Sequence, residues 1–224
     1  MNKIEFGNCA LDYFAREAFK ALRTNIQFCG KDVKAISVTS CIPNEGKTTI
    51  CAELSKSLAE GGKKVLLVDA DMRNSVMTTR YSKGSGIIGL SQYLSGQAGL
   101  SDILFQTQTD NLFVVFSGAF PPNPAELLNT KQFSDFIEDA KTTFDYIIVD
   151  TPPLGLVTDA AIAASVCKNT VLVIGADKVK SNIAIHVKDI LERSGTHILG
   201  VILNHPEQKN KSGTKKEYYY KKYL

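Results

Sequence analysis

The sequence predicts an α/β protein in which a mostly parallel sheet is flanked by helices on both faces. Six short apolar runs recur along the 224 residues, as buried parallel strands do, and helical stretches separate most of them. Each motif with chemical character directly follows one of these runs, and ligands of parallel sheets bind at the carboxyl ends of the strands. Strands that alternate with helices form such a sheet through right-handed crossovers.

An amphipathic helix is expected first, at residues 10–28, because apolar side chains from Leu11 to Ile26 recur there at steps of three and four. The expected strands then follow at Ala35–Thr39, Val65–Val68, Leu112–Phe116, Tyr146–Val149, Val171–Ile174 and Ile198–Leu203. The expected helices between them are residues 48–60, 124–142, 157–167 and 181–194. Gly61 and Gly62 mark the end of the first of these, since glycine commonly terminates helices.

The apolar periodicity stops near His205, which divides the chain into a domain at residues 1–204 and a flexible, disordered tail at residues 205–224. The tail carries six lysines and two glutamates, a net charge of +4, whereas the whole chain is only +3, which leaves −1 for residues 1–204. The body thus offers no basic face for nucleic acid. Three roles for the tail remain open: a solvated end without function, a contact for nucleic acid or acidic lipid, and a substrate with exposed phenol groups.

The chain has no feature of an exported or membrane-spanning protein. No apolar run approaches the ~18 residues that a membrane-spanning helix needs, and the N-terminus has no apolar stretch of the kind found in secretory signals. The five cysteines form no C-x-x-C pair and no metal-ligand spacing, which is typical of free thiols in a reducing compartment. We therefore expect a cytosolic protein without a structural zinc site.

A phosphate-binding loop is the most specific motif in the sequence. The segment Ala35–Thr49 runs from strand through loop to helix and contains the Gly46-Lys47-Thr48 signature. Backbone N–H groups at the helix start would cradle the phosphates of ATP, Lys47 would reach the β- and γ-phosphates, and the Thr48 hydroxyl would ligate magnesium. The residues expected to bind ATP are Cys41, Ile42, Pro43, Asn44, Glu45, Gly46, Lys47, Thr48 and Thr49.

Carboxylates follow two further expected strands. Asp69 and Asp71 come directly after the run at 65–68, and Asp150 follows the run at 146–149. A carboxylate at such a strand end, in a protein with a phosphate loop, is the expected ligand of magnesium. Taken singly, Asp69 or Asp71 could equally be a helix cap or a turn residue. Together with the loop, the three positions predict a Mg-ATP site.

A second glycine-rich string, Gly84–Gly89, fits the G-x-G-x-x-G pattern of dinucleotide-binding sites. No apolar strand precedes it, so the string lacks the context that such a site requires. A glycine-rich loop of the common protein-kinase type would need H-R-D and D-F-G companions, and the sequence has neither. We interpret the string as a mobile surface turn.

With these motifs, the chain resembles the bacterial tyrosine kinases of capsular and exopolysaccharide biosynthesis, in the short form that lacks a membrane segment of its own. The resemblance covers nearly the whole length. The phosphate loop is similar to the family's S-x-x-P-x-E-G-K-[ST] form, and Asp69–Arg73 and Asp150–Pro153 are similar to its second and third motifs. The segment Pro121–Leu128 and the tyrosine-rich terminus are similar as well. Within the loop, Cys41 and Asn44 stand where serine and glycine are usual.

The resemblance implies a P-loop NTPase-like fold and a Mg-ATP-dependent protein-tyrosine kinase that regulates capsular or exopolysaccharide synthesis and export. Its subunits would form a ring and phosphorylate one another's tails in trans. The resemblance implies that Lys47 and the metal ligands Thr48, Asp71 and Asp150 hold Mg-ATP, and that Asp69 accepts the phenol proton. The catalytic residues would thus be Lys47, Asp69 and Asp71. The acceptors would be Tyr218, Tyr219, Tyr220 and Tyr223.

The resemblance also implies partners. Glu17, Lys20 and Arg23 are similar to the family's E-x-x-R-x-x-R subunit-contact motif, with a lysine that keeps the charge of one arginine and loses its bidentate fork. A separate membrane adaptor of the polysaccharide co-polymerase type would activate the chain and recruit it to the inner face of the cell membrane. A cognate tyrosine phosphatase would oppose it, and no nucleic acid is expected.

Three other functions remain open. An ATPase switch of the septum-positioning or plasmid-partitioning type shares the fold, but it carries a signature lysine where this chain has Ile42. An iron–sulfur carrier of this fold would need paired cysteines, and none are suitably spaced. A non-catalytic, ATP-bound regulator of polysaccharide assembly is compatible with the sequence.

Overall fold

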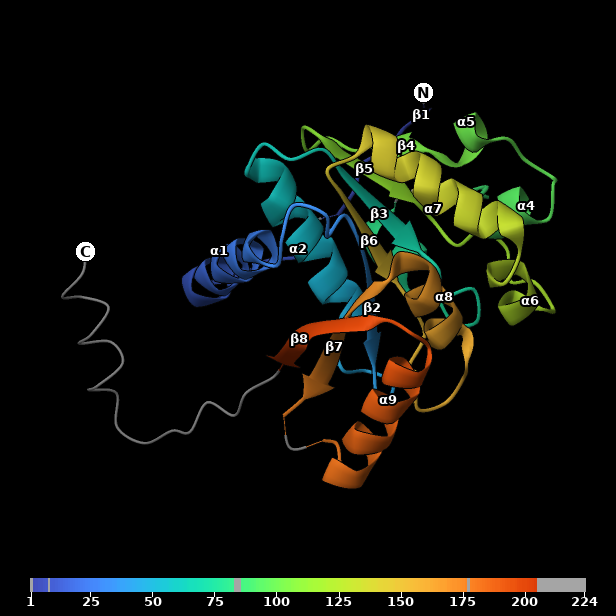
Figure 1. Cartoon of the computed structure of the whole chain (residues 1–224). Helices are drawn as coiled ribbons and strands as arrows, with labels where there is room; N and C mark the ends of the chain where they lie inside the picture. Colours follow the sequence, from blue (N-terminus) through green and yellow to red (C-terminus); the bar gives the residue numbers. More distant parts are fainter. Residues whose placement is uncertain (1, 8, 83–85, 177, 205–224) are drawn as a thin grey trace.

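The computed structural model describes residues 2–7, 9–82, 86–176 and 178–204, which form an eight-stranded sheet with helices on both sides (Figure 1). The strands are β1 (Asn2–Lys3), β2 (Ala35–Ser40), β3 (Val65–Asp69), β4 (Phe105–Gln106), β5 (Leu112–Val115), β6 (Tyr146–Asp150), β7 (Asn169–Gly175) and β8 (His197–Asn204). They lie in the order β1-β4-β5-β3-β6-β2-β7-β8. Neighbouring strands are parallel, except that β4 and β5 pair antiparallel.

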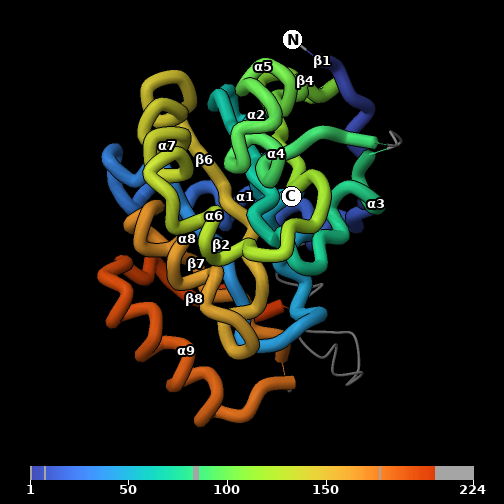
Figure 2. The backbone as a smooth tube through the Cα atoms, turned by 90° about the vertical axis from the view of Figure 1, so that its right-hand side faces the viewer, coloured from blue at the N-terminus to red at the C-terminus, as the bar shows by residue number. Residues whose placement is uncertain are grey.

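The helices of the described residues cover both faces of this sheet. They are α1 (Tyr13–Phe28), α2 (Lys47–Glu60), α3 (Met77–Tyr81), α4 (Leu90–Leu94), α5 (Leu100–Ile103), α6 (Pro124–Leu128), α7 (Lys131–Thr143), α8 (Asp159–Cys167) and α9 (Ser181–Arg193). Figure 1 shows α1 and α2 on one side of the sheet and α7, α8 and α9 on the other, and Figure 2 views the molecule from that second side. Because both faces are covered, the central strands are buried along their whole length.

Alternate side chains of a strand pack into apolar clusters on opposite faces of the sheet. Leu54 of α2 packs in one apolar cluster with Ile36 of β2, whereas Phe133 of α7 packs in another cluster with Ala35 of the same strand. Successive side chains of a strand point to opposite faces, so a strand between two helical layers must be apolar throughout. This requirement explains the continuous apolar runs in the sequence.

Side-chain caps set the start of two helices. Asp12 accepts a hydrogen bond from the backbone N–H of Ala15 at 2.7 Å, so α1 starts at Tyr13 rather than at residue 10. Thr130 accepts from the N–H of Phe133 in the same way and starts α7. The single helix expected at residues 124–142 is therefore wrong, because α6 ends at Leu128 and the cap opens a second helix.

The α/β fold class is confirmed, and the six expected strands are present with bounds that differ by one or two residues. The sequence did not indicate β1, β4, α3, α4 or α5, because elements of two to five residues are too short to show a period. Gly89 is buried directly before α4, so the expected surface turn is wrong at that end of the glycine-rich string. Residues 83–85 and the predicted tail lie outside the described residues. None of the described helices is both long and apolar enough to cross a membrane.

Candidate active site

The phosphate loop lies at the carboxyl end of β2 and leads into α2, as the sequence predicts. Two of its residues take left-handed backbone, Asn44 with φ 62° and Gly46 with φ 87°. Asparagine is among the few non-glycine residues that adopt this conformation readily, so the loop tolerates Asn44 where glycine is usual. Lys47 is the first residue of α2 and is only 7% exposed. The backbone N–H groups of the loop and of the first turn of α2 thus form a ready site for phosphate.

Glu45 braces this loop from inside. Its side chain is fully buried, and its carboxylate accepts hydrogen bonds from the backbone N–H of Ile42 at 2.8 Å and of Gly175 at 2.7 Å. Asn204, at the end of β8, donates from Nδ2 to the carbonyl oxygen of Glu45 at 2.8 Å. The ends of β7 and β8 therefore hold the loop through Glu45, whose carboxylate is occupied by the protein's own backbone.

Cys41 supports the base of the loop. Its side chain is fully buried in the apolar cluster below α9, and burial raises the pKa of the thiol to about 11. A Cβ atom at Gly155 would lie 2.2 Å from the carbonyl oxygen of Cys41, so only glycine permits this close approach. Cys41 therefore acts as a small apolar residue that seats the loop against the segment after β6.

Two carboxylates face each other beside the loop. Asp69 of β3 and Asp150 of β6 are register partners on neighbouring strands, and both are almost completely buried. Burial raises the pKa of Asp150 to about 6, against the opposing effects of the Lys47 ammonium and of a hydrogen bond from Thr48. Within the described part of the chain, Asp150 Oδ1 has no hydrogen-bond partner. A buried carboxylate oxygen without a partner costs free energy, which a bound cation would recover.

The residues present fit a magnesium ion. Thr48 and Asp150 contact each other and supply two oxygen donors, and a nucleotide bound at the phosphate loop would bring its phosphates beside them. The described residues contain no cluster of three or more His, Cys, Asp or Glu side chains that could cage a metal by itself. This composition suits magnesium, which usually binds through one or two carboxylates together with substrate phosphates and water.

Asp69 is the most strongly perturbed carboxyl group of the site. Burial, and then the charge of Asp150, raise its pKa to about 8, although a hydrogen bond from the Ser75 hydroxyl opposes the rise. Its carboxylate also accepts from the backbone N–H of Ser117 at 3.3 Å and of Asp71 at 3.2 Å. A carboxyl group with a pKa near neutrality is suited to proton transfer. Ser75 and Ser117 belong to no motif, so the sequence did not single them out.

Asp71 and Arg73 organise the turn after β3. Asp71 Oδ1 accepts from the backbone N–H of Asn74 at 3.0 Å and of Arg73 at 3.3 Å, which is the turn role that the sequence left open for this residue. Its charge also raises the pKa of both Asp69 and Asp150, so it lies close to them. Arg73 makes a bidentate ion pair with Asp159, from Nε at 2.7 Å and from Nη2 at 2.9 Å. Asp159 opens α8 and is fully buried, and sequence reasoning missed it.

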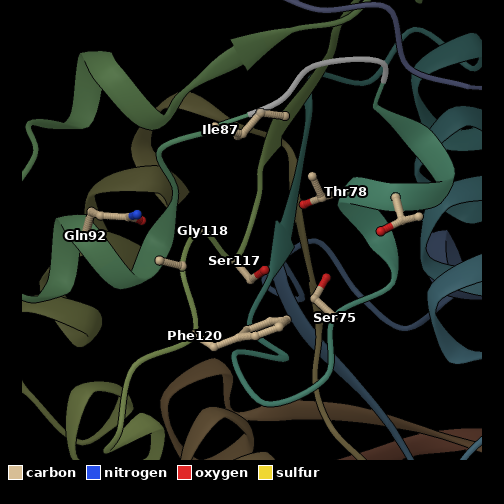
Figure 3. A pocket seen from close by; sticks show the side chains of 10 residues that line it. Ser75, Thr78, Ile87, Gln92, Ser117, Gly118 and Phe120 are labelled. Atoms are coloured by element: carbon tan, nitrogen blue, oxygen red, sulfur yellow. The ribbon is translucent and has the colours of Figure 1, made fainter.

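A pocket of about 380 Å³ opens beside Asp69 (Figure 3). Its lining comes from three stretches of sequence, residues 75–79, 86–92 and 117–120, and the last two are joined by a hydrogen bond from the N–H of Ser91 to the carbonyl oxygen of Ser117. The pocket is lined by Ser75, Thr78, Thr79, Gly86, Ile87, Gln92, Ser117, Gly118, Ala119 and Phe120. Ser75 and Ser117, which both hydrogen-bond to Asp69, lie together near Phe120 in Figure 3. The buried carboxyl group of Asp69 is thus separated from the cavity by its hydrogen-bond partners Ser75 and Ser117, and the lining includes the exposed ring of Phe120.

The other predicted residues lie apart from this site or outside the described residues. Glu17 and Lys20 pair with each other on α1 at 2.7 Å and are partly exposed. Arg23 donates from Nη1 to the carbonyl oxygen of Ser57 at 2.6 Å, which ties α1 to α2 within one chain. Residues 205–224, and with them the four predicted acceptor tyrosines, lie outside the part of the chain that the structure describes.

Comparison with known proteins identifies similar sequences and structures. The AAA-domain family matches residues 33–201. The tyrosine-protein kinase CpsD of Streptococcus agalactiae is 50% identical over 188 residues, which span 84% of this chain and 82% of that protein. The kinase domain of the Escherichia coli tyrosine kinase ETK superposes with a TM-score of 0.83 at 30% identity, covering 90% of this chain and 79% of that one. The chimerical protein CapA2B2 superposes with a TM-score of 0.81 at 33% identity, covering 86% and 85%.

Proposed function

We propose that this chain transfers the γ-phosphoryl group of Mg-ATP to tyrosines of its own C-terminal cluster. The chain belongs to the AAA-domain family and, within it, to the bacterial tyrosine kinases of capsule synthesis. The resemblance drawn from the motifs is thus confirmed for the family and for tyrosine-kinase activity. The observation that carries the detailed proposal is the buried Asp69, which has a raised pKa and is hydrogen-bonded to two residues that line the pocket, Ser75 and Ser117.

The nucleotide would bind with its phosphates on the N-terminal turn of α2. The N–H groups of the loop would hold the phosphate oxygens, and the Lys47 ammonium would neutralise charge on the β- and γ-phosphates. Thr48, Asp71 and Asp150 would hold magnesium, and the ion would supply further neutralisation of the phosphate charge. The orphaned Oδ1 of Asp150 supports this assignment.

The acceptor tyrosine would enter the pocket beside Asp69. A phenol ring would lie between the walls, and its hydroxyl would approach Asp69 past Ser75 and Ser117, the two pocket-lining residues that hydrogen-bond to Asp69. Free tyrosine has a pKa of about 10, and a base with a pKa of about 8 takes up the phenol proton far more readily than an ordinary aspartate does. Asp69 would therefore accept the proton while the phenol oxygen attacks the γ-phosphorus and ADP leaves.

Transfer would occur between subunits of a ring. A tail of 20 residues can extend at most about 70 Å, which is enough to reach a neighbouring site. The exposed Glu17 and Lys20 on α1 are available for a subunit contact, and Arg23 would have to exchange its contact with Ser57 to join them. Each phosphate adds roughly −1.5 to −2 charges, so four modified tyrosines would reverse the tail's net charge of +4. This reversal would weaken docking at a cleft that holds three aspartates, and so regulate the ring.

A membrane adaptor is the proposed activator. The similarity to the chimerical protein CapA2B2 supports a partner of the polysaccharide co-polymerase type, which would bring this cytoplasmic chain to the inner face of the cell membrane. A cognate tyrosine phosphatase would restore the unmodified tail. Through this cycle the kinase would regulate synthesis and export of the polysaccharide.

Labelled Mg-ATP tests the proposal directly. The purified chain is incubated with it, with and without the adaptor's cytoplasmic segment, beside a variant in which Tyr218, Tyr219, Tyr220 and Tyr223 are Phe. We expect label on tyrosine in the wild type and none in the variant, and Lys47→Met should abolish labelling. Steady release of ADP without labelled protein would instead indicate an ATPase switch, and nucleotide binding without turnover would indicate a non-catalytic regulator.

A further inference from the structure

Phe6 connects the N-terminus to the core beneath the pocket. It belongs to the N-terminal arm, by which we mean residues Asn2–Gly7, and it is only 1% exposed. Its ring stacks on Tyr81, with centroids 4.8 Å apart and planes 14° apart, and it lies 6.5 Å from the ring of Phe116. The Lys56 ammonium lies 5.5 Å from the centre of the Phe6 ring, a cation–π contact on the same aromatic group.

The N-terminal arm is held by hydrogen bonds to its backbone and by the pairing of its strand with the sheet. The side chain of Gln108 accepts from the N–H of Phe6 at 2.8 Å and donates to its carbonyl oxygen, which clamps the residue on both sides. Gly7 donates to the carbonyl oxygen of Tyr81 at 2.9 Å and accepts from Lys56 at 2.9 Å. Strand β1 pairs with β4 in addition. These contacts leave the Phe6 ring with little freedom to move.

The two aromatic partners of Phe6 are adjacent in sequence to the residues that form the two pocket walls. Tyr81 is the last residue of α3, the helix that carries Thr78 and Thr79 into one wall. Phe116 directly precedes Ser117–Phe120, which form the other wall. Phe6 thus packs against one residue of each segment that holds Asp69. One segment donates to Asp69 from the Ser75 hydroxyl and the other from the Ser117 N–H. In Figure 3 the segments of Ser75 and Thr78 and of Ser117 and Phe120 face each other.

We propose that Phe6 is a positioning residue that sets the separation of the two pocket walls, and with it the fit of the acceptor tyrosine. Protein interiors are close-packed, so a change in the volume of the Phe6 side chain shifts both segments that pack against it. A shift of about 1 Å in a positioned reactant can lower a rate by about a hundredfold. The proposal rests on the proposed function, because it takes the occupant of the pocket to be a tyrosine.

Matched substitutions test this role. Phe6→Leu reduces the volume of the side chain that packs against both walls. Gln108→Ala removes the exposed side chain that hydrogen-bonds to the Phe6 backbone and leaves the core unchanged. Phe144→Leu is the control, in the aromatic pair Phe113–Phe144 on the other face of the sheet. All are made in a chain whose four tail tyrosines are Phe, so that an added peptide of residues 211–224 is the acceptor. The KM for the peptide and the Kd for ATP are measured at a temperature at which each variant is folded.

Phe6→Leu and Gln108→Ala are each expected to raise the peptide KM by about three- to tenfold while the Kd for ATP changes by less than about twofold. Phe144→Leu should leave both unchanged. Amide hydrogen exchange should become faster in residues 77–82 and 116–120 of the Phe6 variant, and not in the loop at residues 41–48. Equal losses for peptide and ATP, or no change in either, would overturn the positioning role. A parent chain that fails to label the peptide would contradict the proposed function alone, and hydrogen exchange would then decide the role of Phe6.

Discussion

Asp69 and Asp150 stand opposite each other at the carboxyl ends of β3 and β6, with both carboxyl groups buried and a loop for phosphate beside them. The two carboxyl groups differ in their hydrogen-bond partners and in their pKa values. Asp150 Oδ1 has no hydrogen-bond partner in the described part of the chain, and the side chain lies against Thr48, as a metal ligand would. Asp69 is hydrogen-bonded to both pocket walls and has the higher pKa, as a proton acceptor for a phenol would.

Asp69→Asn should lower kcat by about a hundredfold to ten-thousandfold, since the amide cannot accept the phenol proton. The Kd for Mg-ADP should change little, because Asp69 does not contact Thr48 or Lys47 in the proposed arrangement. Phosphotyrosine formation and nucleotide binding are measured on the same protein. The matched control is Asp110→Asn, at an exposed position in the turn between β4 and β5. A parallel loss of nucleotide affinity would assign Asp69 to the metal instead.

The pH dependence of stability should differ between the wild type and Asp69→Asn in the absence of nucleotide and metal. The pKa of Asp69 is about 8 in the folded protein and close to 4 in an unfolded chain. Between these values the folded protein holds a proton that the unfolded chain has released, so a rise in pH favours unfolding. The free energy of unfolding of the wild type should therefore fall, relative to the variant, from about pH 4 to about pH 8. Urea midpoints across this range measure it, and a constant difference would contradict the buried, protonated carboxyl group.

Glu45→Gln should weaken nucleotide binding through the shape of the loop. The new amide group would confront one of the two N–H donors, from Ile42 or Gly175, and leave it buried without an acceptor. Such a loss costs about 1–3 kcal/mol, which corresponds to about a fivefold to 150-fold increase in Kd. Because Glu45 shapes the loop that binds the phosphates, the protein should lose affinity for inorganic tripolyphosphate as much as for ATP.

Asn204→Leu provides the second arm of this experiment, because it removes the donor to the Glu45 carbonyl oxygen. It should also weaken ATP and tripolyphosphate together, whereas a loss confined to ATP would indicate a contact with the base. Glu60→Gln, at the exposed end of α2, is the control and should change neither affinity.

Arg73→Lys should destabilise the junction between β3 and α8. Lysine keeps the charge but cannot donate both bonds of the fork, so one oxygen of the fully buried Asp159 loses its partner. The expected cost is about 1–3 kcal/mol, measured as a lower midpoint of thermal or urea unfolding. Arg16→Lys, at an exposed position of α1, should leave the midpoint unchanged. An unchanged midpoint for Arg73→Lys would show that the bidentate geometry contributes nothing to folding.

Much of the fold could be predicted because its signals are local. A strand such as β2 is buried on both faces and therefore reads as a continuous apolar run, and the Gly46-Lys47-Thr48 signature at the junction with α2 needs only neighbouring residues. Short elements such as α3 and β1 carry no such signal. They depend on contacts that are remote in sequence, as when Phe6 stacks on Tyr81.

The sequence by itself determined which chemical groups reach the active edge of the sheet. Lys47, Thr48, Asp69, Asp71 and Asp150 all follow predicted strands, and parallel strands must end at a common edge. Only the tertiary structure decided the surroundings of these groups. It placed Asp69 opposite Asp150, and among the residues that the structure describes it left Asp150 Oδ1 without a hydrogen-bond partner.

The supporting contacts were likewise decided only by the tertiary structure. Glu45 accepts a hydrogen bond from the N–H of Gly175, which is 130 residues away, and Phe6 contacts Tyr81 and Phe116, which are also far from it in the sequence. The physical reason is that burial and electrostatic fields arise from residues distant in the chain. Local patterns specify which groups are present, whereas their pKa values and hydrogen-bond partners depend on what the fold packs around them.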